Sequence, residues 1–291
     1  MEVLKTVAQM RAWSAGERRA ERRIAFVPTM GALHEGHLSL VKLAREAGDR
    51  VVVSIFVNPI QFDRPEDLAG YPRSDEADLE LCRKHGVDAV FLPAVTEIYP
   101  GGHCTFVDVV GDLTDKLCAA TRPGHFRGVC TVVTKLFGIV TPDVAVFGEK
   151  DLQQLLILSR MVHDLSLPVE IRHGPTVREA DGLAMSSRNR RLSPADRRIA
   201  LCLPRGLQAA NEAFQAGERS SMRLIEALAE EVLCNEGVDL DYADVVSLSG
   251  FKEVETADAD CVLAAAAFIG GIRLIDHIHL GGPGIAVADE G

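Results

Sequence analysis

Short apolar runs alternate with segments of helical spacing over about the first 172 residues. The apolar runs cover 23–27, 51–57, 88–92, 143–147 and 168–171. Between them, the segments 36–47, 74–85, 128–140 and 151–164 repeat apolar residues every three or four positions. This alternation is typical of βαβ units, whose strands form a parallel sheet. In such sheets ligands bind where a strand ends and the chain turns into the next helix.

The pattern changes after residue 175. Helical spacing covers 193–216 and 220–235, and strand-like runs follow at 241–248, 260–269 and 272–280. Ser193 and Pro194 are typical of a helix start, and Pro204 is expected to kink or split the first helical segment. We therefore predict a smaller C-terminal α+β domain, with domains at 1–176 and 177–291. The Gly-rich tail 281–291 is predicted to be disordered.

Composition narrows the function classes. A chain of 291 residues with 47% apolar and 25% charged residues fits two ordinary globular domains. The net charge of −11 argues against binding to nucleic acid or to an anionic membrane, because those partners require a basic face. No segment offers the ~20 consecutive apolar residues of a spanning helix. Seven scattered cysteines without a C-x-x-C pair indicate a reducing, cytoplasmic location.

The first polar motif, VPTMGALHEGH, joins the run 23–27 to a helix that begins near Gly36. Because His34 and His37 are three residues apart, both imidazoles lie on one side of the helix start, where free N–H groups and the helix dipole attract phosphate. Gly31 and Gly36 let a nucleotide approach the backbone. Zinc binding is an alternative, but the zincin pattern requires a second histidine at position 38, which is Leu38. Two surface histidines on a turn are another alternative.

The second motif, FGEKDLQQ, again follows a strand-like run and enters a helix. The spacing puts Lys150, Asp151 and Gln154 on one helix face, with Leu152, Leu155 and Leu156 toward the core. Lys150 suits phosphate, Asp151 a ribose hydroxyl or a cation, and Gln154 a polar substrate. Taken alone, the motif also fits an ordinary charged helix N-terminus.

A third motif, NPIQF, follows the run 51–57 and supplies Asn58 and Gln61. Neutral amides of this kind hold a hydroxy acid without adding charge. The stretch 63–73, rich in Pro, Gly and charged residues, is a candidate lid. An ordinary surface loop is the alternative.

The loop GLAMSSRNRRLS lies at the predicted domain boundary. Ser186, Ser187 and Arg188 offer two hydroxyls and a guanidinium, which suit β- and γ-phosphates. A solvated linker is the alternative reading. The loop RPGHFRG adds Arg122, His125 and Arg127 as a further anion-facing element, and His277 and His279 form a surface or interface pair rather than a ligand site.

Together, VPTMGALHEGH, NPIQF, RPGHFRG, FGEKDLQQ and MSSRN closely resemble the motifs of the pantothenate synthetase (pantoate–β-alanine ligase) family, in this order and spacing. The resemblance covers essentially the whole chain. It implies a Rossmann-like, doubly wound α/β fold of the H-x-G-H nucleotidyltransferases. The implied enzyme is an AMP-forming ligase of pantothenate biosynthesis, in which pantoate attacks the α-phosphate of Mg-ATP and β-alanine displaces AMP from the pantoyl-adenylate. A homodimer is also implied, and the C-terminal domain would close over the substrates.

The resemblance also implies residue roles. The catalytic residues would be His37 as proton donor, His34, Lys150 and Arg188. The ATP site would comprise Met30, Gly31, Ala32, Leu33, His34, Glu35, Gly36, His37, Gly148, Glu149, Lys150, Asp151, Val177, Met185, Ser186, Ser187 and Arg188. Pantoate and β-alanine would be bound by Gln61, Gln154, Asn58 and Met30. Mg²⁺ would arrive with ATP, and no residue is expected to form a resident metal site.

Two rival functions stay open at this point. One is an adenylyltransferase that passes AMP to a phosphate-bearing acceptor, against which the uncharged Gln61 and Gln154 pair argues. The other is an RNA-binding or regulatory descendant of a synthetase, against which the acidic net charge argues.

Overall fold

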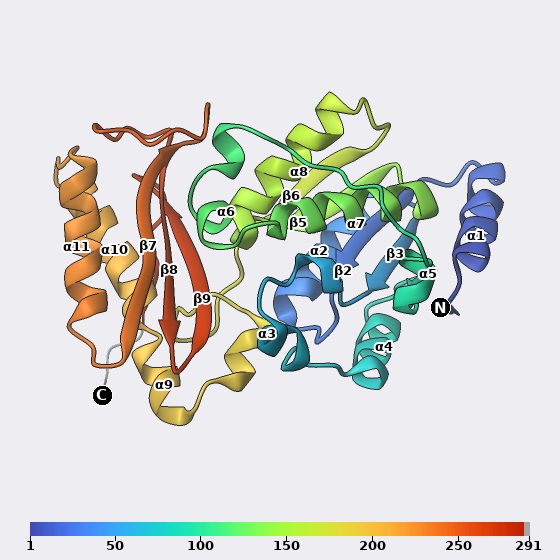
Figure 1. The fold of residues 1–291 in the computed structure, drawn as a ribbon, viewed down its shortest axis with the longest axis horizontal. Helices are drawn as coiled ribbons and strands as arrows, with labels where there is room; N and C mark the ends of the chain where they lie inside the picture. The colour runs from blue at the N-terminus through green and yellow to red at the C-terminus, as the bar shows by residue number, and fades with distance from the viewer. Residues whose placement is uncertain (288–291) are drawn as a thin grey trace. The chain divides into compact units, whose positions relative to one another are not determined.

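The computed structural model describes residues 1–287 and divides the chain into two compact units (Figure 1). The first unit comprises Met1–Val110 and Arg122–Pro175, and the second comprises Gly111–Thr121 and Thr176–Gly291. The sequence analysis left segment 111–121 in the first domain, whereas it clusters with the second unit. The ATP-binding and lid roles of the predicted domains stay predictions.

The first unit is built on a six-stranded, all-parallel sheet of order β1-β4-β3-β2-β5-β6. Its strands are β1 (Glu2–Leu4), β2 (Ile24–Thr29), β3 (Arg50–Ile55), β4 (Ala89–Phe91), β5 (Val144–Gly148) and β6 (Glu170–Gly174). The five strands from β2 to β6 are those that the apolar runs predict. The short edge strand β1 was not predicted, because three residues carry no period.

Helices cover both faces of this sheet, which confirms the predicted doubly wound α/β fold. The helices of this unit are α1 (Val7–Arg19), α2 (Glu35–Ala47), α3 (Pro65–Ala69), α4 (Asp75–Lys84), α5 (Val95–Ile98), α7 (His125–Val140) and α8 (Leu152–Asp164). On one face, Val41 of α2 and Cys82 of α4 belong to the same buried cluster as Val27. On the other face, Phe137 of α7 packs edge to face on Phe26, with ring centroids 6.4 Å apart. Neighbouring residues of β2 therefore point to opposite layers, as strand geometry requires.

The strand order reverses at β2, with β3 and β4 on one side of it and β5 and β6 on the other. Ligands of open parallel sheets bind outside the carboxyl ends of the strands at this reversal. The turn 30–37 follows β2, the turn 58–61 follows β3, and residues 149–151 follow β5. Three of the predicted motifs thus leave adjacent strands at the same edge of the sheet.

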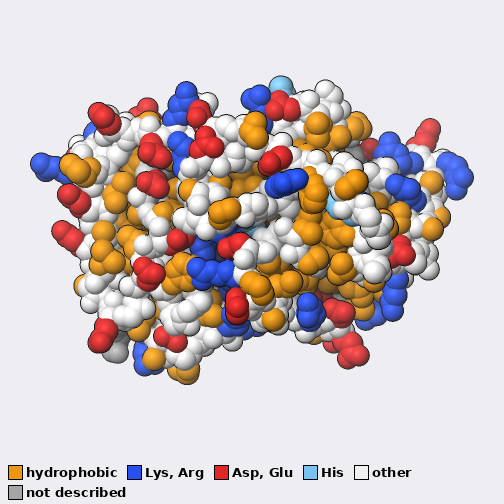
Figure 2. Space-filling model, in the orientation of Figure 1, with side chains coloured by type: hydrophobic (Ala, Val, Ile, Leu, Met, Phe, Trp, Pro, Cys, Tyr) orange, Lys and Arg blue, Asp and Glu red, His pale blue; other side chains and the backbone are white. Residues whose placement is uncertain are grey.

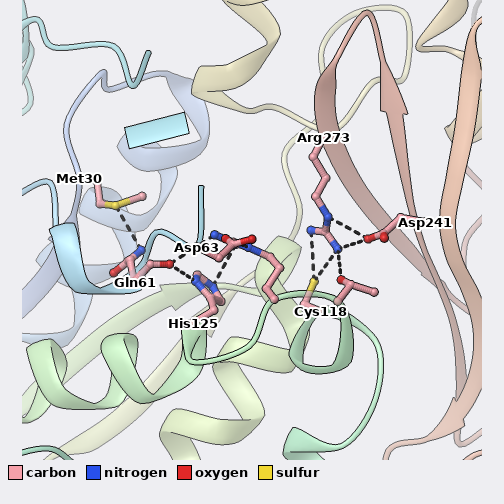
Figure 3. A network of polar contacts seen from close by, with 9 residues as sticks. Met30, Gln61, Asp63, Cys118, His125, Asp241 and Arg273 are labelled. Carbon is pink, nitrogen blue, oxygen red and sulfur yellow. Dashed lines mark hydrogen bonds and ion pairs between the residues drawn. The ribbon is translucent and has the colours of Figure 1, made fainter. Parts of the chain in front are cut away.

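The second unit has an antiparallel sheet of order β7-β8-β9, formed by Val238–Ser247, Cys261–Ile269 and Ile272–His279. Helices α9 (Pro194–Ile199), α10 (Cys202–Gln215) and α11 (Ser221–Leu233) accompany it, and α10 and α11 share a buried apolar cluster with the strands. Segment 111–121, which includes α6 (Cys118–Thr121), contacts the sheet through the Arg273 side chain (Figure 3). The predicted α+β composition is therefore confirmed.

Pro204 marks a helix boundary, as predicted. The helical segment is interrupted at residues 200 and 201, and Pro204 occupies the first turn of α10. Proline is tolerated there because the first N–H groups of a helix have no intrahelical partner. Ser193 caps α9, and its hydroxyl accepts a hydrogen bond from the Asp196 N–H at 3.1 Å.

The predicted disorder of the tail is wrong for its first part. Ile285 is only 8% exposed, and its N–H donates to Oε1 of Gln208 at 2.6 Å. An apolar side chain removed from water stabilises an ordered end. Residues 288–291 lie outside the described part of the chain.

The described surface mixes charges of both signs. Basic side chains are interspersed with acidic ones over the face shown in Figure 2. None of the helices within residues 1–287 combines the length and apolar character that crossing a bilayer demands.

Candidate active site

The turn after β2 is held by a buried carboxylate. Gly31 and Ala32 adopt left-handed backbone conformations, with φ of +83° and +51°. Oδ2 of Asp78 accepts the Ala32 N–H at 2.7 Å, and Oδ1 accepts the Leu33 N–H at 2.8 Å. Asp78 lies on α4 and is 1% exposed, and the Ser74 hydroxyl also donates to it at 3.1 Å. Charge-assisted bonds to backbone N–H groups can stabilise this strained turn.

The two histidines lie together at the start of α2. His34 is the N-cap, the helix begins at Glu35, and the ring centroids of His34 and His37 are 4.1 Å apart. The His34 N–H donates to Nδ1 of His37 at 3.4 Å, which leaves Nε2 of a neutral His37 to carry the ring proton. Both side chains are partly exposed. Imidazole groups beside a helix N-terminus can bind an anion there.

The turn after β5 supplies an ammonium group. Residues Glu149–Asp151 form a 3-10 turn, and α8 begins only at Leu152, so Lys150 and Asp151 precede the regular helix that the sequence analysis placed them on. Nζ of Lys150 lies 3.7 Å from Oδ1 of Asp151, and the two side chains are 20% and 49% exposed. Gln154 is partly exposed in the first turn of α8. Leu152 and Leu155 are buried as predicted, whereas Leu156 is only partly buried.

In the turn after β3, the side chain of Gln61 lies between two neutral side chains, those of Asn58 and Met30. Asn58 is 1% exposed and Gln61 8% exposed, and Nδ2 of Asn58 donates to Oε1 of Gln61 at 2.8 Å. Nε2 of Gln61 points to Sδ of Met30 at 3.3 Å (Figure 3). Met30 belongs to the turn after β2, so the predicted acid-binding and ATP-binding turns are in direct contact.

The backbone of Gln61 is supported from behind by α7 and the residues before it. Its carbonyl lies 2.7 Å from Nδ1 of His125, and Nε2 of His125 lies 3.2 Å from a guanidinium nitrogen of Arg122 (Figure 3). Because the guanidinium only donates, Nε2 must accept, so the proton of His125 lies on Nδ1 and is donated to the Gln61 carbonyl. Burial, together with the charge of Arg122, lowers the pKa of His125 to about 4. His125 is therefore a neutral structural donor.

The two arginines of the loop 122–128 each contact a residue outside it. Nε of Arg122 donates to Oδ1 of Asp63 at 2.9 Å. Burial alone would raise the pKa of Asp63, but the hydrogen bond and the charge of Arg122 lower it overall. The guanidinium of Arg127 stacks on the Phe106 ring, 4.1 Å from its centroid. The expected anion-facing element is thus a scaffold for Gln61 as far as Arg122 and His125 are concerned.

In the second unit, the segment 177–191 is an ordered hairpin rather than a solvated linker. The Met185 N–H donates to the Val177 carbonyl at 2.9 Å, and Arg178 pairs with Ala184 across the hairpin. The Arg178 guanidinium makes a bidentate contact with the buried carboxylate of Asp276 on β9, at 2.7 and 3.0 Å. These bonds fix the backbone from which the predicted phosphate-binding residues project.

The side chains of this hairpin differ in their exposure to solvent. The Ser186 hydroxyl accepts the Arg188 N–H at 3.2 Å and so caps the short turn Ser187–Arg191. Ser187 is only 5% exposed, whereas Arg188 is partly exposed. On β9, His277 is 6% exposed, so the surface position expected for it is wrong.

The first unit therefore offers one edge with a phosphate-compatible end and a neutral, amide-lined end. Within the described residues 1–287, no three His, Cys, Asp or Glu side chains are grouped as a metal site. Lys150, the imidazoles and the helix start are groups that can bind an anion, while the amide of Gln61 suits a polar, uncharged group or an acceptor oxygen.

Comparison with known proteins identifies the family. The family model described as pantoate-beta-alanine ligase matches residues 2–279. The chain belongs to the pantoate–β-alanine ligase family. A pantothenate synthetase of Heliobacterium modesticaldum is 52% identical over 278 residues, which cover 96% of this chain and 99% of the relative.

Solved structures of the family agree. The pantothenate synthetase of Thermus thermophilus is similar to this chain with a TM-score of 0.91 and 44% identity, covering 96% of this chain and 99% of that one. The pantoate-beta-alanine ligase of Francisella tularensis, complexed with beta-gamma ATP and beta-alanine, gives a TM-score of 0.80 and 31% identity over 97% of this chain and 99% of that one. The pantoate–β-alanine ligase fold is therefore shared over nearly the whole chain.

Two residues that support the turns after β2 and β3 were not predicted from the sequence. Asp78 supports the turn after β2, and Tyr99 donates its hydroxyl proton to Oδ1 of Asn58 at 2.7 Å. One feature of the sequence could have indicated Asp78. It precedes the buried Cys82 by four residues and therefore lies on the core-facing side of a predicted helix. No feature of the sequence indicated Tyr99, because it follows the four-residue helix α5, which is too short to show a helical period.

Proposed function

We propose that this chain condenses pantoate with β-alanine at the expense of ATP, yielding pantothenate, AMP and pyrophosphate. The observation that carries the proposal is the sheet edge at the reversal of strand order. There, the H-x-G-H turn, the Lys150 turn and the Gln61 turn leave adjacent strands in a member of the pantoate–β-alanine ligase family. Ligand sites of such sheets lie at this edge.

The first step activates the acid. A pantoate carboxylate oxygen attacks the α-phosphorus of ATP, the bond from that phosphorus to the bridging oxygen breaks, and pyrophosphate leaves with the electron pair. Phosphoryl and nucleotidyl transfers depend on alignment and on neutralisation of charge more than on covalent help. We assign Lys150 and the α2 start to this charge, and Nε2 of His37 to proton donation. Its Nδ1 already accepts the His34 N–H, which supports that assignment.

The second step forms the amide. The neutral amine of β-alanine attacks the acyl carbon of pantoyl-adenylate, the bond to the AMP oxygen breaks, and the nitrogen loses a proton. Gln61, Gln154 and Met30 are assigned to the acid and amine substrates. Neutral groups around an acyl-adenylate suit this step, since the site holds a nucleophile and an electrophile without supplying a competing charged nucleophile.

Several finer assignments rest on the family pattern. Residues 30–37, 148–151, Val177 and 185–188, with Arg188 among them, are assigned to ATP, which we expect to bind as its Mg²⁺ complex. A homodimer and a cytoplasmic location are proposed on the same basis. Analytical ultracentrifugation tests the dimer, and magnesium titration of the rate tests the metal requirement.

The experiment that tests the function is a direct product assay. Purified protein with ATP, Mg²⁺, pantoate and β-alanine is expected to release AMP and pantothenate in equal amounts. Each substrate is omitted in turn as the control. AMP formation that never depends on pantoate, or the absence of pantothenate from the complete mixture, would contradict the proposal.

A further inference from the structure

Tyr99 lies outside the family motifs and has no role in the mechanism above. It directly follows α5, and its ring packs between Phe56 and His103, with centroids 6.2 and 4.9 Å away. Its hydroxyl reaches the turn after β3, where it lies 2.7 Å from Oδ1 of Asn58. Because its hydroxyl bonds to the buried amide of Asn58, Tyr99 is a candidate for controlling the orientation of that amide.

The amide of Asn58 has only one orientation that satisfies its neighbours. Its Nδ2 lies 3.1 Å from the carbonyl oxygen of Gly128, which can only accept a hydrogen bond. The NH₂ end must therefore face Gly128, and Oδ1 must face Tyr99, which makes the Tyr99 hydroxyl the donor. A buried amide turned the other way would bring its oxygen against the acceptor oxygens of Gly128 and Gln61.

Gly128 itself is required for this approach. A Cβ atom at position 128 would lie 2.5 Å from the Ile60 carbonyl oxygen and 2.8 Å from Cα of Gln61. A side chain at position 128 would therefore push the Asn58 to Gln61 turn away. The backbone of α7 is thus packed directly against the turn that carries the acid-binding glutamine.

The same logic orients Gln61. The second hydrogen of Asn58 Nδ2 is directed at Oε1 of Gln61, 2.8 Å away. The oxygen end of the Gln61 amide is thereby occupied, and its Nε2 is directed at Sδ of Met30 at 3.3 Å. A thioether is a weak acceptor, so a carboxylate or hydroxyl oxygen of a substrate is a better partner for these hydrogens.

We propose that Tyr99 is a positioning residue which, through Asn58, makes Gln61 present its NH₂ group rather than its oxygen to the carboxylic-acid substrate. The inference rests on the proposed function and deepens it. It says that the acid is recognised by its acceptor oxygens and that Asn58, whose two Nδ2 hydrogens are both engaged, acts through Gln61 instead of contacting the acid with its NH₂ group.

The hydroxyl of Tyr99 keeps its proton throughout the working pH range. Burial raises the pKa of Tyr99 well above its ordinary value, because the phenolate would be poorly solvated there. The direction of the hydrogen-bond chain therefore does not reverse with pH. Tyr99→Phe removes the donor while keeping the ring between Phe56 and His103.

A double-mutant cycle tests the inference. We would measure kcat and KM for pantoate and for ATP in the wild type, in Tyr99→Phe, in Gln61→Ala and in the double variant. Loss of one buried hydrogen bond predicts a roughly fivefold to thirtyfold decrease of kcat/KM for pantoate in Tyr99→Phe, with KM for ATP unchanged. In the Gln61→Ala background the same change is expected to have less than about a twofold effect, because the group it positions is gone.

Tyr242→Phe is the matched control. It removes the hydroxyl of another partly buried tyrosine, which lies 3.2 Å from Sγ of Cys118 in the second unit, and is expected to leave kcat/KM for pantoate unchanged. An unchanged pantoate kcat/KM in Tyr99→Phe would overturn the inference, and so would an equal loss with and without Gln61. If the wild type itself forms no pantothenate, the proposed function fails and the inference fails with it. A normal wild type separates the two failures.

Discussion

The turns after β2 and β3 leave neighbouring strands at the same edge of the sheet, but they are held by opposite chemistry. The turn after β2 is strained at Gly31 and Ala32 and is fixed by the buried carboxylate of Asp78. The side chains of the turn after β3 are oriented by neutral groups, namely the amides of Asn58 and Gln61 and the hydroxyl of Tyr99, although Arg122 and His125 also contact the backbone carbonyl of Gln61. A carboxylate thus holds the backbone at the end assigned to phosphate, whereas neutral hydrogen bonds orient the side chains at the end assigned to the acid.

This difference has a physical reason. A carboxylate that accepts two backbone N–H groups can stabilise a turn by about 1.5–3 kcal/mol per charged bond, which offsets left-handed strain. No residue from 56 to 62 has a positive φ, so the turn after β3 contains no left-handed strain for a charged group to offset. Neutral hydrogen bonds are enough to orient its amides.

The largest expected effect comes from removing the ammonium group at the phosphate end. Lys150→Ala is expected to lower kcat by roughly 10²–10³, because one well-placed group facing developing charge contributes about 2.7–4 kcal/mol. Thermal unfolding should change little, since the side chain is not buried in the core. His37→Ala is expected to behave in the same way.

Lys84→Ala, an exposed lysine in the last turn of α4, is the control for that loss. It removes the same charge away from the sheet edge. Steady-state kinetics and melting curves of Lys150→Ala, His37→Ala and Lys84→Ala show whether the loss of activity is specific to the sheet edge. Near-normal adenylate formation by Lys150→Ala would remove this residue from the phosphate end.

Asp78→Asn should affect the turn after β2 and spare the turn after β3. The variant replaces one acceptor oxygen by an NH₂ group that faces a backbone N–H, and we expect unfolding to become easier by about 1.5–3 kcal/mol. KM for ATP should rise, while KM for pantoate should stay near the wild-type value. Denaturant melts and initial rates measure the two quantities.

Asp75→Asn is the matched change on the exposed side of α4 and should be almost silent. If Asp78→Asn raised KM for pantoate as much as KM for ATP, the two turns would not be supported independently.

The smallest effect concerns pH and the turn after β3. The pKa of His125 is about 4 in the folded chain against an ordinary value of 6.5, so the unfolded chain binds more protons between these values. Stability is therefore expected to fall as pH drops below about 6.5 and to level off below about 4. Between pH 7 and pH 5 this one group should remove about 2 kcal/mol.

His125→Asn keeps an N–H near the Nδ1 position and should lack this part of the pH dependence. His163→Asn changes an exposed histidine of α8 and should retain the pH dependence of the wild type. Free energies of unfolding from urea titrations at pH 7, 6 and 5 provide the comparison. Identical pH slopes in the wild type and in His125→Asn would contradict the neutral role of His125.

The elements around the site could be predicted because their signals are local. The apolar run 51–57 ends in NPIQF, and the run 143–147 ends in FGEKD, so period and motif together gave strand ends and side-chain chemistry. The edge on which they meet followed from the rule for parallel sheets. Lys150 was predicted to lie on the helix but lies in the 3-10 turn before it, because a 3-10 turn is hard to distinguish from helical spacing.

The supports of the site could not be predicted in the same way. Asp78 is 46 residues from the Ala32 N–H it accepts, and Tyr99 is 41 residues from Asn58. No spacing rule connects such pairs, because their contact depends on how α4 and the residues after α5 pack on the sheet. The grouping of segment 111–121 with the second unit depends on tertiary contacts of Cys118 and Arg273 for the same reason.

The most direct test of the central claim isolates the first step at this sheet edge. Radiolabelled pyrophosphate is incubated with the protein, ATP, Mg²⁺ and pantoate, in the absence of β-alanine. The account predicts label exchange into ATP that requires pantoate and is abolished to background by Lys150→Ala. Exchange without pantoate, or none with it in a protein that is folded, would contradict the formation of a pantoyl-adenylate.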